Sequence, residues 1–291
     1  MFKQKEGDCM ETFERSGLRI TWLNGGNNHL DGGAMFGVVP KALWTRKYPE
    51  SSNNTIELRT DPLLIEIDDR LILIEAGIGR GKLSEKQKRN LGVTEESQVE
   101  ASLEALGYRP EDIDTICMTH LHNDHAGGLT TVNERGELYS VFPNATIYVS
   151  ETEWDEMRAP NIRSKNAYWK ENWEPIQEQV KTFTTSVHVH PFIEMIHTGG
   201  HSAGHSILKM TVGDEVIYHM GDLLGTHAHL SSLWVMAYDD YPMDSIAQKE
   251  AIIQRGIEEG AYFTFYHDAY YRVIQWSKDK KEIQFALKRK R

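Results

Sequence analysis

Residues 119–128 read THLHNDHAGG and place four metal-ligand side chains, His120, His122, Asp124 and His125, within six positions. Imidazole is the commonest metal ligand in proteins, and a neighbouring aspartate adds an oxygen ligand. The segment follows residues 113–118, an apolar run that is typical of a buried strand. The chain must therefore fold so that the end of this strand delivers its ligands to a shared site, as strands do in sheets flanked by helices.

The same order, an apolar strand followed by histidine or aspartate, recurs three times: His201 after residues 193–196, Asp222 after 216–220, and His267 after 262–266. Because alternate residues of an extended chain share a face, the first two histidines of the cluster are expected at one ion. We predict two ligand sets around two divalent ions. The first set is His120, His122 and His201, the second is Asp124, His125 and His267, and Asp222 bridges them.

Without a thiolate, this donor set suits Zn²⁺ first but also Mn²⁺, Fe and Co²⁺. Two ions roughly 3.5–4 Å apart hold a hydroxide and lower its pKa towards about 7. We therefore predict hydrolysis by attack of a bridging hydroxide, with Asp124 carrying the proton to the leaving group. The non-enzymatic alternative is a metal-dependent module that binds a signal molecule without hydrolysing it.

The net charge of −11 over 291 residues argues against a nucleic-acid or membrane-surface partner. Two distant cysteines, Cys9 and Cys117, do not form a disulfide framework, and Cys117 is expected to be a buried strand thiol. The start of the chain lacks the apolar core of a signal peptide, and no apolar run is long enough to cross a membrane. We expect a soluble, cytoplasmic protein, with release from the cell as an open alternative.

Residues 1–15 are predicted to be a flexible extension and residues 16–291 a single domain, because no Gly/Ser- or Pro-rich linker divides them. Residues 63–67 and 71–74 have the pattern of a β-hairpin, and 99–106 have that of a helix. The segments 18–180 and 191–291 have matching strand and helix content. We therefore expect one sandwich built from two related halves.

The spacing of Trp169, Trp173, Ile176 and Val180 predicts one face of a helix. Two uses of this aromatic face are open, packing into the core or forming a dimer or lid surface. The second use makes a homodimer reasonable.

The ligand order HxHxDH followed by His201, Asp222 and His267 resembles that of the metallo-β-lactamase-fold hydrolases. The resemblance spans most of the chain and implies an α/β fold, a four-layer αββα sandwich with the metal site at one edge. It also implies the same division of ligands between two metals.

Residues 30–44, 161–174 and 237–246 resemble the YtnP-type quorum-quenching lactonases, which open the ring of N-acyl-homoserine lactones. Methyl parathion hydrolase looks like a more distant relative, so a phosphotriesterase or a broad esterase is the enzymatic alternative. Better-known acyl-homoserine lactonases carry a tyrosine three residues after the bridging aspartate, where this chain has Gly225. Either His227, His229 or Tyr238 takes its place, or the substrate is a different one.

A small lactone or ester with an acyl chain requires an apolar pocket wall. Residues 34–40 form an apolar loop that must cover something, either the core or one wall of a substrate pocket. The side chains expected to contact the substrate are Phe36, Trp44, Met157, Tyr168, His229 and Trp234.

Overall fold

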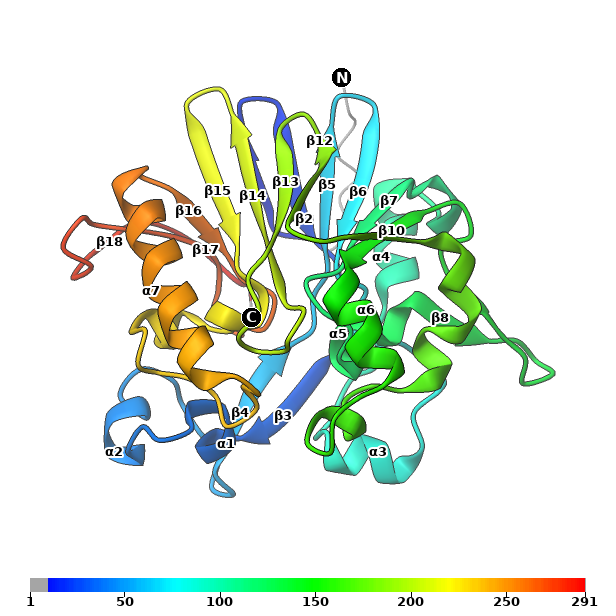
Figure 1. Cartoon of the computed structure of the whole chain (residues 1–291), viewed down its shortest axis with the longest axis horizontal. Helices are drawn as coiled ribbons and strands as arrows, with labels where there is room; N and C mark the ends of the chain where they lie inside the picture. The colour runs from blue at the N-terminus through cyan, green and yellow to red at the C-terminus, as the bar shows by residue number, and fades with distance from the viewer. Residues whose placement is uncertain (1–9, 291) are drawn as a thin grey trace.

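The computed structural model describes residues 10–290 and contains two seven-stranded sheets that face each other (Figure 1). The first sheet has the order β1 (Thr12–Arg15), β2 (Leu18–Trp22), β5 (Leu63–Ile67), β6 (Arg70–Ile74), β7 (Thr115–Cys117), β10 (Thr146–Ser150) and β11 (Val180–Phe183). The second has the order β12 (Ser186–His190), β13 (Ile193–His197), β14 (Ser206–Val212), β15 (Glu215–His219), β16 (Tyr262–Thr264), β17 (Tyr271–Trp276) and β18 (Ile283–Lys288). Each half of the chain thus builds one sheet, as predicted.

Two short ribbons, β3 (Asn27–Asp31) with β4 (Thr55–Arg59) and β8 (Thr130–Val132) with β9 (Leu138–Ser140), lie outside the main sheets. The α-helices are α1 (Gly32–Phe36), α2 (Lys41–Trp44), α3 (Glu85–Asn90), α4 (Val99–Leu106), α5 (Asn123–Ala126), α6 (Glu151–Arg158) and α7 (Pro242–Glu258). The 3₁₀ turns are η1 (Pro110–Asp112), η2 (Gly127–Leu129), η3 (Ser164–Asn166), η4 (Lys170–Asn172), η5 (Glu174–Gln179), η6 (Gly221–Leu224) and η7 (His227–Leu230). The predicted hairpin and the predicted helix over 99–106 are both confirmed.

The alternation of side chains along the strands explains how the layers of the fold pack together. Successive side chains of a strand point to opposite faces, so in β5 Leu63 and Ile65 enter the core between the sheets while Leu64 faces outwards. Leu103 of α4 packs against that outer face, and Ile253 of α7 packs against the outer face of the second sheet. The result is the predicted four-layer αββα sandwich (Figure 1).

The predicted helix through Trp169, Trp173, Ile176 and Val180 is wrong. Residues 170–179 form two 3₁₀ turns and Val180 begins β11, because Pro175 lacks the amide hydrogen that a continuous helix needs. Ile176 is fully buried against the first sheet and its helices, with Trp173 and Val180 partly buried beside it. Trp173 therefore packs against the core, and the homodimer loses the helix on which its prediction rested.

The predicted flexible extension is too long. Residues Thr12–Arg15 form β1, which pairs with β2 in register, and the side chain of Phe13 lies in the core between the sheets. Residues 1–9, including Cys9, lie outside the described part of the chain. Cys117 is buried in β7, as expected. Of the helices in residues 10–290, none combines the length and the apolar character that a membrane span requires.

Candidate metal centre

All seven predicted ligands meet at one edge of the sandwich, at the ends of strands from both sheets. The loop after β7 and the helix α5 supply His120, His122, Asp124 and His125. The loop after β13, the turn η6 and the loop after β16 supply His201, Asp222 and His267. Four segments that are distant in sequence thus form one site, which the repeated strand-then-ligand pattern predicted.

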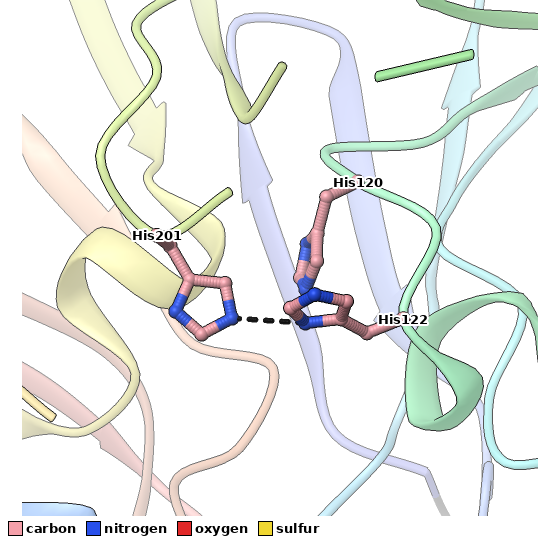
Figure 2. Close-up of side chains that lie close together, drawn as sticks. All are labelled: His120, His122 and His201. Carbon is pink, nitrogen blue, oxygen red and sulfur yellow. Dashed lines mark hydrogen bonds between the residues drawn. The ribbon is translucent and has the colours of Figure 1, made fainter. Parts of the chain in front are cut away.

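The first set of histidines forms a compact group (Figure 2). The ligand atoms of His120, His122 and His201 lie within 4.8 Å of one another, and Nε2 of His201 is 3.1 Å from Nδ1 of His122. Nδ1 of His120 donates to the hydroxyl of Thr119, which itself donates to Glu75. The lone pair of His120 is therefore on Nε2, which is buried and has no hydrogen-bond partner among the described residues.

The second set lies beside the first. Ligand atoms of Asp124, His125 and His267 are also within 4.8 Å of one another, and the two Nε2 atoms of His125 and His267 are 3.1 Å apart. Nδ1 of His267 donates to the backbone carbonyl of Arg59 at 2.7 Å. Because a carbonyl can only accept, this bond fixes the ring so that Nε2 presents its lone pair to the site.

Asp222 lies between the two sets. Its Oδ2 is 3.3 Å from Nε2 of His201, while its Oδ1 is 3.4 Å from Nε2 of His125 and 3.2 Å from Nε2 of His267. Burial alone would raise the pKa of Asp222, but the positive charges that His267, His125 and His201 carry when no metal is bound hold that pKa well below its usual value. One ionised carboxylate thus presents a different oxygen to each histidine set.

The spacing of these atoms suits metal ions. Two ligands at about 2.1 Å from a tetrahedral ion are about 3.4 Å apart, close to the 3.1–3.6 Å separations between ligand atoms of this site. Burial and the neighbouring histidines also hold the pKa of His120 and of His122 well below the usual value, so both rings are neutral and able to bind a metal. The residues present therefore fit two divalent ions.

Buried carboxylates lie close to the second ring nitrogen of two of the candidate histidine ligands. Asp239 Oδ1 is 2.8 Å from Nδ1 of His201, and its Oδ2 accepts from the backbone amide of Met236. Glu75 Oε1 is 3.5 Å from Nδ1 of His125. The hydrogen bond to Asp239 leaves Nε2 as the ring nitrogen that His201 can offer to a metal.

Glu153 joins the two main ligand loops. Its Oε1 accepts from the amide of Leu121, between the first two histidines, and its Oε2 accepts from the hydroxyl of Ser202, next to His201. Tyr168 donates to the same carboxylate at 2.9 Å. Sequence reasoning missed Glu153 and Asp239, because both belong to ordinary acidic stretches without neighbouring histidines.

A cavity of about 420 Å³ opens onto the centre. Its metal-side lining is His122, Asp124, His201, Asp222 and His267. Its apolar lining is Leu30, Met35, Leu58, Leu91, Met236 and Ala237. The other polar side chains of the lining include Asn28, Asn123, Arg163, Ser164, Tyr238 and Asp240. This volume suits a small organic ligand.

None of the six side chains predicted to contact the substrate lines this cavity. Phe36 is fully buried and stacks between Trp44 and His229, with ring centroids 4.9 and 4.6 Å away. Trp234 meets the same ring edge-on at 6.0 Å. These aromatic residues pack with one another behind Met35 and Met236, which do line the cavity.

The other two predicted contacts, Met157 and Tyr168, belong to the core between the first sheet and its helices. Tyr168 nevertheless supports the centre, since its ring lies 5.1 Å from that of His122 and its hydroxyl binds Glu153. Both residues thus belong to the core and do not line the cavity.

The three side chains considered in place of a tyrosine at Gly225 lie in different surroundings. His229 is buried with hydrogen bonds to Thr226 and to the Met35 carbonyl, and His227 binds Asp268. Tyr238 instead lines the cavity. Burial, followed by the charges of Asp124 and Asp31, raises the pKa of its phenol, which therefore stays protonated at neutral pH.

The chain is similar to several known proteins. The solved structure of a probable metal-dependent hydrolase from Staphylococcus aureus superimposes with a TM-score of 0.92 at 44% identity, over 96% of this chain and 99% of that one. The dizinc quorum-quenching lactonase AidC, solved with an N-acyl homoserine product, superimposes with a TM-score of 0.77 at 18% identity, over 97% of each chain. At that identity, the similarity to AidC shows a shared fold.

Two relatives by sequence align with part of the chain. A probable metallo-hydrolase of Mycobacterium tuberculosis is 25% identical over 187 residues, 57% of each protein. An N-acyl homoserine lactonase of Bacillus thuringiensis is 28% identical over 154 residues, 50% of this chain and 55% of that protein. The aligned part is therefore little more than half the length of these relatives.

The metallo-beta-lactamase superfamily matches residues 57–263, which include six of the seven ligands at the centre; the seventh, His267, follows directly. The superfamily match covers most of the chain, and the Staphylococcus aureus structure covers nearly all of it. The chain belongs to the metallo-beta-lactamase superfamily.

Proposed function

We propose that this protein is a metal-dependent hydrolase that binds two divalent ions and opens the lactone ring of N-acyl-homoserine lactones. The observation that carries the proposal is the position of Asp222, whose two carboxylate oxygens face different histidine sets at 3.2–3.4 Å. The similarity to N-acyl homoserine lactonases supports the substrate class.

His120, His122 and His201 would hold one ion, Asp124, His125 and His267 the other, and Asp222 both. The nitrogen and oxygen donors suit Zn²⁺, and Mn²⁺, Fe²⁺ or Co²⁺ share the preference. When bound, such ions supply Lewis acidity and lower the pKa of water to about 7.

The protein side chains would handle the proton and orient the substrate. Asp124 borders the cavity, and its Oδ2 lies 3.6 Å from Nε2 of His267. Its other oxygen would accept the proton of the attacking water and return it to the ring oxygen when the bond from that oxygen to the carbonyl carbon breaks. One water is consumed, and the product is the ring-opened hydroxy acid.

Tyr238 would donate a hydrogen bond to an oxygen of the lactone, since its phenol stays protonated in the cavity. The acyl chain would lie against the apolar lining formed by Leu30, Met35, Leu58 and Met236. A cavity with an apolar side and a few convergent polar groups is typical of sites for small organic ligands.

The test compares three substrate classes on one zinc-loaded preparation: N-acyl-homoserine lactones, nitrophenyl esters and the phosphotriester paraoxon. We expect kcat/KM for lactone ring opening to exceed the other two values by about 100-fold or more, a margin of about 2.7 kcal/mol in transition-state binding. Hydrolysis of paraoxon at the higher rate would assign the protein to the phosphotriesterases instead.

A further inference from the structure

The cavity contains buried polar atoms without hydrogen-bond partners, and these atoms fall into two groups. The first group belongs to the metal centre, as with Oδ1 of Asp222. The second group is neutral and consists of the side-chain atoms of Asn28, the Oδ1 atom of Asn123 and the Oγ atom of Ser164. If unpartnered atoms of the first group indicate metals, those of the second group indicate another polar ligand in the same cavity.

Asn28 is the most isolated of these residues. It lies in β3 opposite Leu58 of β4, and paired residues of neighbouring strands share a face. That face, with Leu30 and Leu58, belongs to the apolar lining of the cavity. Asn28 is fully buried there, and neither Oδ1 nor Nδ2 has a hydrogen-bond partner within residues 10–290. A carboxamide in such a position is unfavourable unless a bound molecule satisfies it.

Asn123 and Ser164 add two more hydrogen-bond acceptors. The backbone amide and Nδ2 of Asn123 both donate to the carbonyl of Ala167, at 2.8 and 3.3 Å. Because that carbonyl can only accept, the orientation of the amide is fixed and Oδ1 is the unpartnered atom. Ser164, in the turn η3 just before Ala167, is buried with its Oγ unpartnered among the described residues.

The chemistry of these atoms defines the group that they can bind. All three side chains are neutral, so they do not compensate a buried ionic group. The amide oxygens of Asn28 and Asn123 can only accept, so the ligand must bring a hydrogen-bond donor, while Nδ2 of Asn28 requires an acceptor and the Ser164 hydroxyl can pair with either. A secondary amide supplies both an N–H and a carbonyl. A phosphotriester or a plain alkyl ester supplies acceptors only.

We propose that Asn28, assisted by Asn123 and Ser164, recognises a secondary amide of the substrate and thereby selects esters and lactones that carry an acylamino group. This inference rests on the proposed function, because it places the amide in the cavity where the ester would be cleaved. It adds the residues that distinguish acylamino lactones from simple alkyl lactones.

The experiment measures discrimination between two lactones by the zinc-loaded protein. One is an N-acyl-homoserine lactone, and the other is an α-alkyl-γ-butyrolactone of the same chain length, in which methylene groups replace the amide. The ratio of their kcat/KM values is compared between the wild type and the variants Asn28→Leu, Ser164→Ala and the double variant. Comparing ratios between proteins cancels the difference in chemical reactivity between the two lactones.

We expect the double variant to lower this ratio by about tenfold or more, because a site built to bind an N–H loses its preference when its polar groups are removed. Most of the loss should come from Asn28→Leu. A ratio within twofold of the wild-type value in the double variant would overturn the proposal. So would a wild-type protein that prefers the alkyl lactone after correction for alkaline hydrolysis.

Leu30→Ala is the matched control, because Leu30 lies two residues from Asn28 in β3 and also lines the cavity. It should change kcat/KM for both lactones by the same factor, and a loss of discrimination as large as that of the double variant would contradict a role for the amide. The melting temperature of Asn28→Leu should equal or exceed that of the wild type, since leucine removes an unpartnered amide. If this variant does not fold, Asn28→Ala removes the same amide without the branched side chain.

A second substrate pair separates this inference from the proposed function. Nitrophenyl esters of an N-acylglycine and of a fatty acid of the same length differ only by the amide. If the wild type opens no lactone, the proposed function fails, and the ester pair still tests Asn28 by the same ratio. If lactones are opened but neither pair shows a change in the variants, the amide inference alone fails.

Discussion

Replacing Asp239 by asparagine should weaken metal binding at the ion that His201 helps to hold. Oδ1 of Asp239 lies 2.8 Å from Nδ1 of His201, and Oδ2 accepts from the amide of Met236 at 3.3 Å. An asparagine of the same shape has one acceptor oxygen for these two N–H groups. In either orientation its NH₂ group faces another donor, so one buried hydrogen bond is lost.

Losing one such bond costs about 1–3 kcal/mol, and removing the partner of a metal-bound histidine typically lowers metal affinity about 10- to 100-fold. We therefore expect Asp239→Asn to raise the Zn²⁺ dissociation constant of one ion about 10- to 100-fold. The dissociation constant of the other ion, with His125 and His267, should change much less. The assay is competition between metal-free protein and a chromophoric chelator of known affinity.

Asp240→Asn provides the matched control, because the neighbouring carboxylate pairs with Arg163 at 2.6 Å and contacts no ligand histidine through its side chain. Its zinc affinity should stay within about twofold of the wild-type value. An unchanged affinity in Asp239→Asn, or an equal loss in both variants, would refute the role assigned to Asp239.

Three further predictions test other parts of the molecule. Asp124→Asn should lower kcat at least about 100-fold with an unchanged circular dichroism spectrum, and near-normal kcat would contradict its role as proton carrier. Tyr238→Phe should lower kcat/KM for lactones about tenfold, and identical steady-state kinetics would remove it from the site. Asp61 is buried between Arg59 and Arg272, whose charges hold its pKa below the usual value against the effect of burial. It thus contributes stability above about pH 4 that is lost as the pH falls through its folded pKa. Urea unfolding of metal-free Asp61→Asn should show a loss of about 3–5 kcal/mol at neutral pH that shrinks below about pH 4, and a constant difference would contradict this.

The fold and the grouping of the candidate ligands could be predicted because their signals are local. Each ligand follows an apolar strand, and the ends of strands from both sheets meet at one edge of the sandwich. The hairpin over residues 63–74 and the helix over 99–106 form as their hydrophobic periodicities predict. Pro175 was the local signal that should have divided the predicted helix around Trp173.

The substrate cavity could not be predicted in the same way, because its lining is set by tertiary packing. Phe36 was predicted to contact the acyl chain of the substrate. In the structure it stacks with Trp44 and His229, and Met35 and Met236 line the cavity instead. Asn28, in contrast, was not predicted to contact the substrate, although it lines the cavity. Nothing in the sequence distinguishes it from the neighbouring Asn27, and only its buried position opposite Leu58 indicates a role.

The most direct test of the dinuclear lactonase is a titration of the metal-free protein with Zn²⁺, followed by the initial rate of ring opening of an N-acyl-homoserine lactone. Because Asp222 faces both histidine sets, we predict that the rate rises until two equivalents of zinc are bound per chain and then stays constant. A full rate at one equivalent, or no ring opening at any ratio of zinc to protein, would contradict the account.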